Sequence, residues 1–110
     1  MVYANAPGHH FYNDLPEEEQ KRLADALRPH SIASFKDGAR NAAHLVVPSS
    51  YLLCELDNAI VPAAQEAMVQ GVRDAGADMR VERLKCGHSP FLSHPDETVD
   101  FLLRAAKTEH

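Results

Sequence analysis

Residues 49–86 read SSYLLCELDNAIVPAAQEAMVQGVRDAGADMRVERLKC, and this stretch sets the expected architecture of the chain. Its first part, SSYLLCEL, is an almost uninterrupted apolar run, which is typical of a strand buried on both faces of a parallel sheet. A helix is expected from about Pro62 to a C-terminal cap at Gly76, because small and apolar side chains recur on one face of it. The partly alternating MRVERLKC then predicts a second strand.

A second helix is expected after this strand. Ser93 is its candidate N-cap, and its apolar face is expected to consist of Val99, Leu102, Leu103 and Ala106. The order strand, helix, strand, helix makes a βαβα unit, whose strands are parallel and whose crossover is right-handed in nearly all known cases. The sequence therefore predicts the α/β class, with one half of a doubly wound sheet.

The residues before this unit are less regular. Asp14 is the candidate N-cap of a helix in which three glutamates complement the helix dipole, and Pro29 ends that helix. The first residues lack any period and are expected to be disordered. The expected division is a disordered arm at 1–10, a helical segment at 11–47 and the βαβα unit at 48–110.

Charge and hydropathy limit the possible partners. The 110 residues suit one domain, and their net charge of −5 comes without a cluster of Lys and Arg, which argues against nucleic-acid binding. Apolar runs fall well short of the roughly 20 residues that span a membrane, and the N-terminus lacks a signal-peptide pattern. We therefore expect a cytoplasmic protein with small molecules or proteins as partners, and no membrane or nucleic acid.

The two cysteines, Cys54 and Cys86, are too few for a disulfide scaffold and are expected to be buried free thiols. An alternative for Cys86 is a metal site that it would form with His88 and His94. Its C-x-H and H-x5-H spacings match no standard zinc pattern. We expect neither a metal nor a cofactor.

Two polar residues directly follow the two predicted strands. Asp57 comes after the first strand and His88 after the second, so neighbouring parallel strands bring a carboxylate and an imidazole to the same edge of the sheet. An Asp that accepts a hydrogen bond from one ring nitrogen leaves the other nitrogen as a general base. The alternative is that Asp57 starts a turn and His88 is an ordinary loop residue. Glu55 is a rival carboxylate, and surface positions are expected for His30, His44, His94 and His110.

Two motifs in this region resemble a known family. Asp57, Pro62 and Gln65 resemble the acid turn and following helix of α/β-hydrolase-fold proteins, especially a fungal esterase-like group related to plant methylesterases and hydroxynitrile lyases. The sequence GHSP at residues 87–90 resembles the motif that carries the catalytic histidine of that family. FYNDLPEEEQKRLADALRPHSIASF, from Phe11, is similar to the end of its cap segment. The resemblance covers roughly residues 11–107 and implies a partial α/β-hydrolase fold, a cap at 11–47, an orienting acid at Asp57 and a general base at His88.

The family's nucleophile elbow, G-x-S-x-G, does not occur in these 110 residues. One hypothesis from the resemblance is an acyl-ester hydrolase of secondary-metabolite biosynthesis, acting on a small-molecule ester with a nucleophile supplied by another chain or by an upstream part of the protein. The other is a catalytically inactive, truncated module that associates with itself or another chain through an exposed sheet edge.

Overall fold

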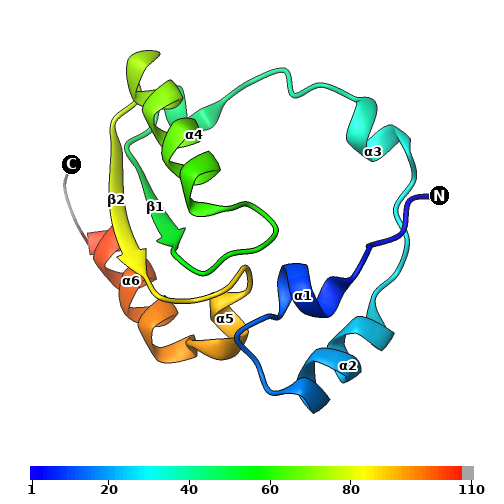
Figure 1. The fold of residues 1–110 in the computed structure, drawn as a ribbon. Helices are drawn as coiled ribbons and strands as arrows, with labels where there is room; N and C mark the ends of the chain where they lie inside the picture. Colours follow the sequence, from blue (N-terminus) through cyan, green and yellow to red (C-terminus); the bar gives the residue numbers. More distant parts are fainter. Residues whose placement is uncertain (108–110) are drawn as a thin grey trace.

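The computed structural model describes residues 1–107, and its centre is a parallel sheet of two strands. Strand β1, Ser49–Cys54, pairs with β2, Met79–Leu84, in a register that places Ser49 opposite Met79 and Cys54 opposite Leu84. The predicted α/β class with parallel strands is confirmed. Because both strands run in the same direction, the residues that follow them emerge at the same edge (Figure 1).

Helices cover the two faces of this sheet. Helix α4, Pro62–Asp74, lies against the face that carries Leu53 and Val81, whereas α6, Pro95–Lys107, lies against the opposite face (Figure 1). Pro62 occupies the first turn of α4, where the missing N–H costs nothing, and Gly76 follows its end with a positive φ of 98°. The predicted position of this helix is therefore confirmed.

The last helix differs from its expected orientation. Phe101 is its buried residue, whereas Val99, Leu102 and Leu103 are 52%, 57% and 48% exposed. A sheet of two strands is too narrow to cover the whole apolar side of α6, so these three residues extend beyond it. Ser93 is also not the N-cap of α6, because it ends the short helix α5, Pro90–Ser93.

Four short helical elements precede the sheet. They are α1 (Pro7–Phe11), α2 (Glu17–Ala26), α3 (Ala33–Lys36) and the 3-10 helix η1 (Ala43–Leu45), and they form an arc beside the sheet (Figure 1). Within residues 1–10, where the sequence suggests a disordered arm, the structure places the start of α1 and a β-bridge to His30. Pro7 starts α1, and Val2 pairs with His30 through two backbone hydrogen bonds, Val2 N to His30 O at 2.6 Å and His30 N to Val2 O at 2.8 Å.

Asp14 does not cap the helix that follows it. Helix α2 has Pro16 at its N-cap with no side-chain cap hydrogen bond, and its glutamates at 17–19 supply the negative charge in the first turn. The Asp14 carboxylate instead accepts hydrogen bonds from Gly87 and Ser93, in and after the loop that follows β2.

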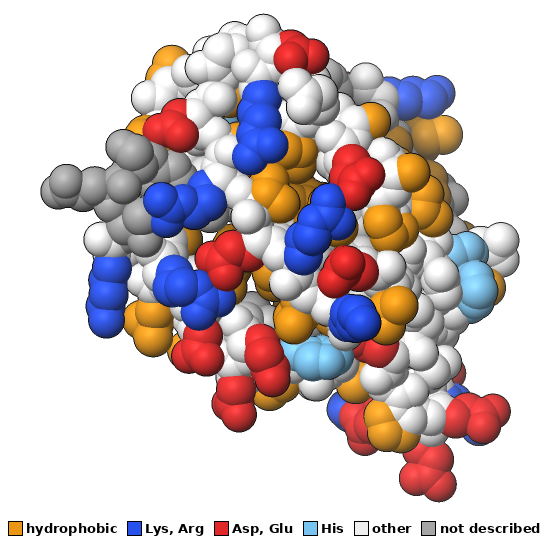
Figure 2. All heavy atoms as spheres, turned by 60° about the vertical axis from the view of Figure 1, so that its left-hand side comes forward, with side chains coloured by type: hydrophobic (Ala, Val, Ile, Leu, Met, Phe, Trp, Pro, Cys, Tyr) orange, Lys and Arg blue, Asp and Glu red, His pale blue; other side chains and the backbone are white. Residues whose placement is uncertain are grey.

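The surface carries mixed charges. On the face over β2 and α6, Lys and Arg side chains alternate with Asp and Glu, with apolar side chains between them (Figure 2). That mixture differs from the single basic stripe of a nucleic-acid interface. Within residues 1–107, no helix is long and apolar enough to span a membrane.

Candidate active site

Asp57 and His88 meet at the carboxyl edge of the sheet. The Nδ1 atom of His88 lies 2.9 Å from Oδ2 of Asp57. The Asp57 side chain is 5% exposed and the His88 side chain 34%, so the carboxylate is buried and the imidazole reaches the surface. The structure thus brings together the two residues that strand order predicted to be neighbours.

The second oxygen of Asp57 fixes the orientation of the carboxylate. Oδ1 accepts backbone hydrogen bonds from Ala59 N at 2.8 Å and Ile60 N at 3.0 Å. This Asx-type turn is the turn chemistry expected of Asp57, and it coexists with the contact to His88. Because both oxygens are engaged, Oδ2 stays aimed at the imidazole.

Gln65 supports the acid loop from α4. Its Nε2 donates to Cys54 O at 2.9 Å and to Ile60 O at 2.7 Å, while its Oε1 accepts from Cys54 N at 3.0 Å. The Tyr51 hydroxyl also donates a hydrogen bond to Oε1 at 3.2 Å. Gln65 is 1% exposed. The amide therefore ties the end of β1 to the start of α4, with Asp57 between them.

The two ring nitrogens of His88 differ in their hydrogen bonding. Nδ1 faces Asp57, and within residues 1–107 no hydrogen bond is made by Nε2. The ring of Phe11 lies beside the imidazole, with centroids 5.4 Å apart and planes 34° apart. When Nδ1 carries the proton and donates a hydrogen bond to Asp57, Nε2 is left with a lone pair and can act as a base.

The other candidate residues lie elsewhere. Glu55 makes no hydrogen bond with His88. His94 is not an isolated surface residue, because its Nδ1 lies 2.9 Å from Ser93 Oγ and 3.5 Å from Asp14 Oδ2. His110 lies outside the described residues.

The cysteines are buried beneath this edge. Cys54 and Cys86 are free thiols that interact with each other, and burial raises the pKa of both. Thiolates are the reactive form of cysteine, so neither residue suits a nucleophile. Within residues 1–107, no group of three or more His, Cys, Asp and Glu residues is arranged to hold a metal ion.

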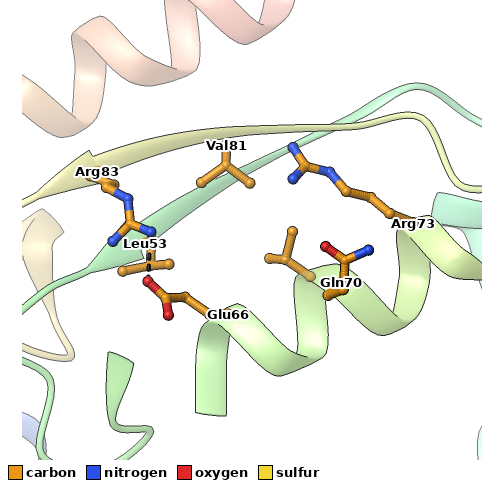
Figure 3. A pocket seen from close by; sticks show the side chains of 7 residues that line it. Leu53, Glu66, Gln70, Arg73, Val81 and Arg83 are labelled. Atoms are coloured by element: carbon orange, nitrogen blue, oxygen red, sulfur yellow. Dashed lines mark hydrogen bonds and ion pairs between the residues drawn. The ribbon is translucent and has the colours of Figure 1, made fainter. Parts of the chain in front are cut away.

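A groove of about 560 Å³ lies between α4 and the sheet, away from Asp57 and His88. Leu53 and Val81 form its floor, and the ion pair between Arg83 Nη2 and Glu66 Oε1, 2.6 Å long, crosses one end (Figure 3). Arg73 donates two hydrogen bonds to Met79 O, at 3.0 and 2.7 Å. The polar side chains that line the groove are engaged in these contacts and in a hydrogen bond from Gln70 to Asp74, and they include no carboxylate–imidazole pair.

Comparison with known proteins shows the family of the chain. The model of the alpha/beta hydrolase family matches residues 2–101. The chain belongs to the alpha/beta hydrolase family. Its two parallel strands alternating with helices are a partial α/β-hydrolase fold.

Curated fungal hydrolases are among the relatives of this chain. The probable hydrolase R7 of Phoma sp. is 35% identical over 94 residues, which is 84% of this chain and 37% of that protein. The alpha/beta hydrolase nvfD of Aspergillus novofumigatus is 33% identical over 95 residues, or 86% of this chain and 37% of that protein. The chain thus spans little more than a third of the length of these relatives.

Sequence reasoning missed two residues that touch both loops of the site, Asn13 and Asp14. The local pattern before α2 suggests a helix cap at Asp14, and no local signal points to a partner 73 residues away.

Proposed function

We propose that this chain supplies the general base and the orienting acid of an acyl-ester hydrolase. The observation that carries the proposal is the 2.9 Å contact between His88 Nδ1 and Asp57 Oδ2 at the carboxyl ends of two paired parallel strands. Membership of the alpha/beta hydrolase family supports the same chemistry. The proposed substrate is a small-molecule ester, with secondary-metabolite esters as the class that the resemblance favours.

In this proposal each residue has a separate task. Nε2 of His88 takes the proton of a nucleophile's hydroxyl as that oxygen attacks the ester carbonyl, and then gives the proton to the departing alcohol. Asp57 keeps the Nδ1–H tautomer in place and stabilises the imidazolium that forms in between. Water then attacks the acyl group on the nucleophile: His88 takes a proton from the water and gives it to the nucleophile's oxygen as the bond to the acyl carbon breaks, which releases the acid and restores the hydroxyl.

The nucleophile is proposed to come from outside residues 1–110. These residues contain no G-x-S-x-G motif, and the chain spans 37% of each of the two hydrolases named above. An upstream segment of the same polypeptide or a second chain can supply it. Members of a triad act as a unit, so the pair alone is expected to give little turnover.

Hydrolysis of p-nitrophenyl acyl esters tests the proposal. The chain is assayed alone and joined to a segment that carries a G-x-S-x-G elbow, and each form is compared with its His88→Ala and Asp57→Asn variants. We expect turnover in the joined form, a fall of about 10⁴-fold for Asp57→Asn and a loss at least as large for His88→Ala. His44→Ala is the matched control and is expected to leave turnover unchanged.

Turnover that survives His88→Ala contradicts the proposal. An absence of turnover in every joined form, with the fold intact by circular dichroism, also contradicts it and favours the second candidate function.

The second candidate is a non-catalytic module that pairs with a second copy of itself. Within residues 1–107 the sheet has two strands, so the outer edges of β1 and β2 lack a further strand. Helix α6 adds exposed apolar surface through Val99, Leu102 and Leu103. Unpaired strand edges and apolar patches are surfaces through which chains associate.

Light scattering after size-exclusion chromatography separates the two candidates. The module predicts a dimer whose population rises with concentration and falls when Leu102 and Leu103 are both replaced by Lys. A chain that stays monomeric up to high micromolar concentration contradicts the module, whatever its enzymatic activity.

A further inference from the structure

The segment that joins α1 to α2 contacts both loops of the proposed acid–base pair. It lies beside the carboxyl ends of the strands although it is distant in sequence (Figure 1). Its contacts fall on the residues next to Asp57 and next to His88, in addition to the ring contact between Phe11 and His88. These contacts distinguish the segment from a linker that only joins two helices at the surface.

Asn13 holds the acid loop. Its Nδ2 donates to the carbonyl of Leu56, the residue before Asp57, at 2.7 Å. On the other side of Asp57, Asn58 Nδ2 donates to His9 O at 3.0 Å. The acid is therefore flanked by two hydrogen bonds to the N-terminal part of the chain.

Asp14 holds the histidine loop. Its Oδ2 accepts from Gly87 N, the residue before His88, at 2.7 Å and from Ser93 Oγ, after the loop, at 2.6 Å. The side chain is 10% exposed. Hydrogen bonds to a buried carboxylate are among the stronger ones in proteins, so Asp14 restrains the loop at both ends.

The second side-chain oxygen of Asp14 and the amide oxygen of Asn13 both face Gly87. Asn13 Oδ1 and Asp14 Oδ1 are buried and have no hydrogen-bond partner within residues 1–107. A Cβ at Gly87 would overlap Asn13 Oδ1 and lie 2.9 Å from Asp14 Oδ1. Because Gly87 has no side chain, the two oxygens can lie close to its backbone, where they can form weak C–H···O contacts with its Cα hydrogens.

We propose that Asn13 and Asp14 are positioning residues that hold the Asp57 loop and the His88 loop at the separation required for the Asp57–His88 hydrogen bond. Asn13 is bound to the residue before the acid, and Asp14 to the residue before the base. Because Asn13 and Asp14 are adjacent in the chain, they fix the two loops relative to each other. Asp14 touches neither the imidazole nor Asp57, so it acts on the pair through the Gly87 backbone.

The catalytic consequence rests on the proposed function, whereas the positioning itself is measurable without turnover. The readout is ¹⁵N NMR of the histidine side chains of the 110-residue chain, which reports which ring nitrogen of His88 is protonated and how fast the Nδ1 proton exchanges with water. Three variants are compared with the wild type. They are Asp14→Leu, which has no acceptor, Asp14→Asn, which keeps one, and Val69→Ala, which truncates the buried core of α4 away from the loops.

We expect Asp14→Leu to speed exchange of the His88 Nδ1 proton by at least about tenfold, the effect of losing one good hydrogen bond. Asp14→Asn is expected to stay close to the wild type, because its side-chain oxygen still accepts from Gly87. Val69→Ala lowers the thermal midpoint but is expected to leave His88 unchanged. A purely structural role for Asp14 predicts instead that exchange follows the thermal midpoint in all variants.

Wild-type exchange in Asp14→Leu overturns the proposal, as does an equal acceleration in Val69→Ala at the same loss of stability. If Asp14→Leu does not fold, Asn13→Ala replaces it and removes only the bond to Leu56. Exchange about tenfold faster supports the proposal and unchanged exchange overturns it. Neither result depends on whether the joined form hydrolyses esters, so failure of the positioning role and failure of the hydrolase function remain distinguishable.

Discussion

At the scale of single residues, the site depends on where a few polar atoms point. One oxygen of Asp57 is fixed by backbone amides, which leaves the other for His88. Asn13 and Asp14 are proposed to act on this pair only through its position. They matter because an error of about 1 Å at an acid–base pair is enough to lower a rate 100-fold.

Gly87 gives a direct test of packing at this scale. We expect Gly87→Ala to lower the free energy of unfolding by about 1–3 kcal/mol, because the new methyl group overlaps Asn13 Oδ1 and the loop must shift. Urea denaturation monitored by circular dichroism measures the change.

Gly71→Ala is the matched control for this prediction. A Cβ at Gly71 meets nothing within 4 Å, and the residue lies inside α4. Alanine there is expected to stabilise the chain by about 0.5–1 kcal/mol. Equal effects at the two glycines would show that the contact at Gly87 is unimportant.

At the scale of helices and strands, the sequence predicted what is local. The apolar run of β1, the glycine stop after α4 and the second strand are each specified by neighbouring residues, and strand order then brings Asp57 to His88. The contacts of Asp14 span 73 and 79 residues, which no periodicity encodes. The orientation of α6 could not be predicted either, because it depends on the width of the sheet, which determines which apolar residues of α6 the sheet covers.

Gln65 tests how strongly α4 supports the acid loop. Gln65→Leu is expected to lower the free energy of unfolding by at least about 2 kcal/mol, because the N–H and C=O of buried Cys54 lose their partner. Chemical denaturation gives this value directly.

Gln70→Leu on the same helix is the comparison, since Gln70 is exposed and, within residues 1–107, its side chain forms a hydrogen bond with Asp74 and no other residue. A change within about 0.5 kcal/mol is expected there. A similarly small change for Gln65→Leu would mean that α4 does not brace the loop.

At the scale of the whole molecule, the surface is large for the length of the chain. The accessible area is 7725 Å², against about 6,000 Å² for a typical folded chain of this size. The radius of gyration, 15.6 Å, likewise exceeds the roughly 13 Å of a compact domain of this length. The excess area is about twice the roughly 800 Å² that each partner contributes to a standard protein interface, so the proposed docking of a nucleophile-bearing segment or of a second copy has enough surface.

The buried thiols make the stability of the whole chain depend on pH. Burial raises the pKa of Cys54 and Cys86 in the folded state, whereas in the unfolded chain they ionise from about pH 8.5. The folded state then binds more protons than the unfolded state above that pH. Their contribution to stability is therefore complete below about pH 8.5 and falls above it, by up to about 1.4 kcal/mol per pH unit for each thiol.

Urea midpoints between pH 7 and pH 9.5, in the presence of a reductant, measure this decline. The variant in which both cysteines are Ala is expected to lose less stability than the wild type above about pH 8.5. Identical slopes for the two proteins would contradict the burial of the thiols.

The contact between Asp57 and His88 is tested most directly by ¹⁵N NMR of the His88 side chain in the wild type and in Asp57→Asn. We expect the wild type to hold its proton on Nδ1. Asp57→Asn is expected to move the proton to Nε2, because the amide oxygen takes the place of Oδ1 beside the backbone N–H groups of Ala59 and Ile60, and the amide NH2 that then donates to Nδ1 requires a lone pair there. A wild-type imidazole already protonated on Nε2, or a tautomer that does not respond to the substitution, would contradict the proposed acid–base pair.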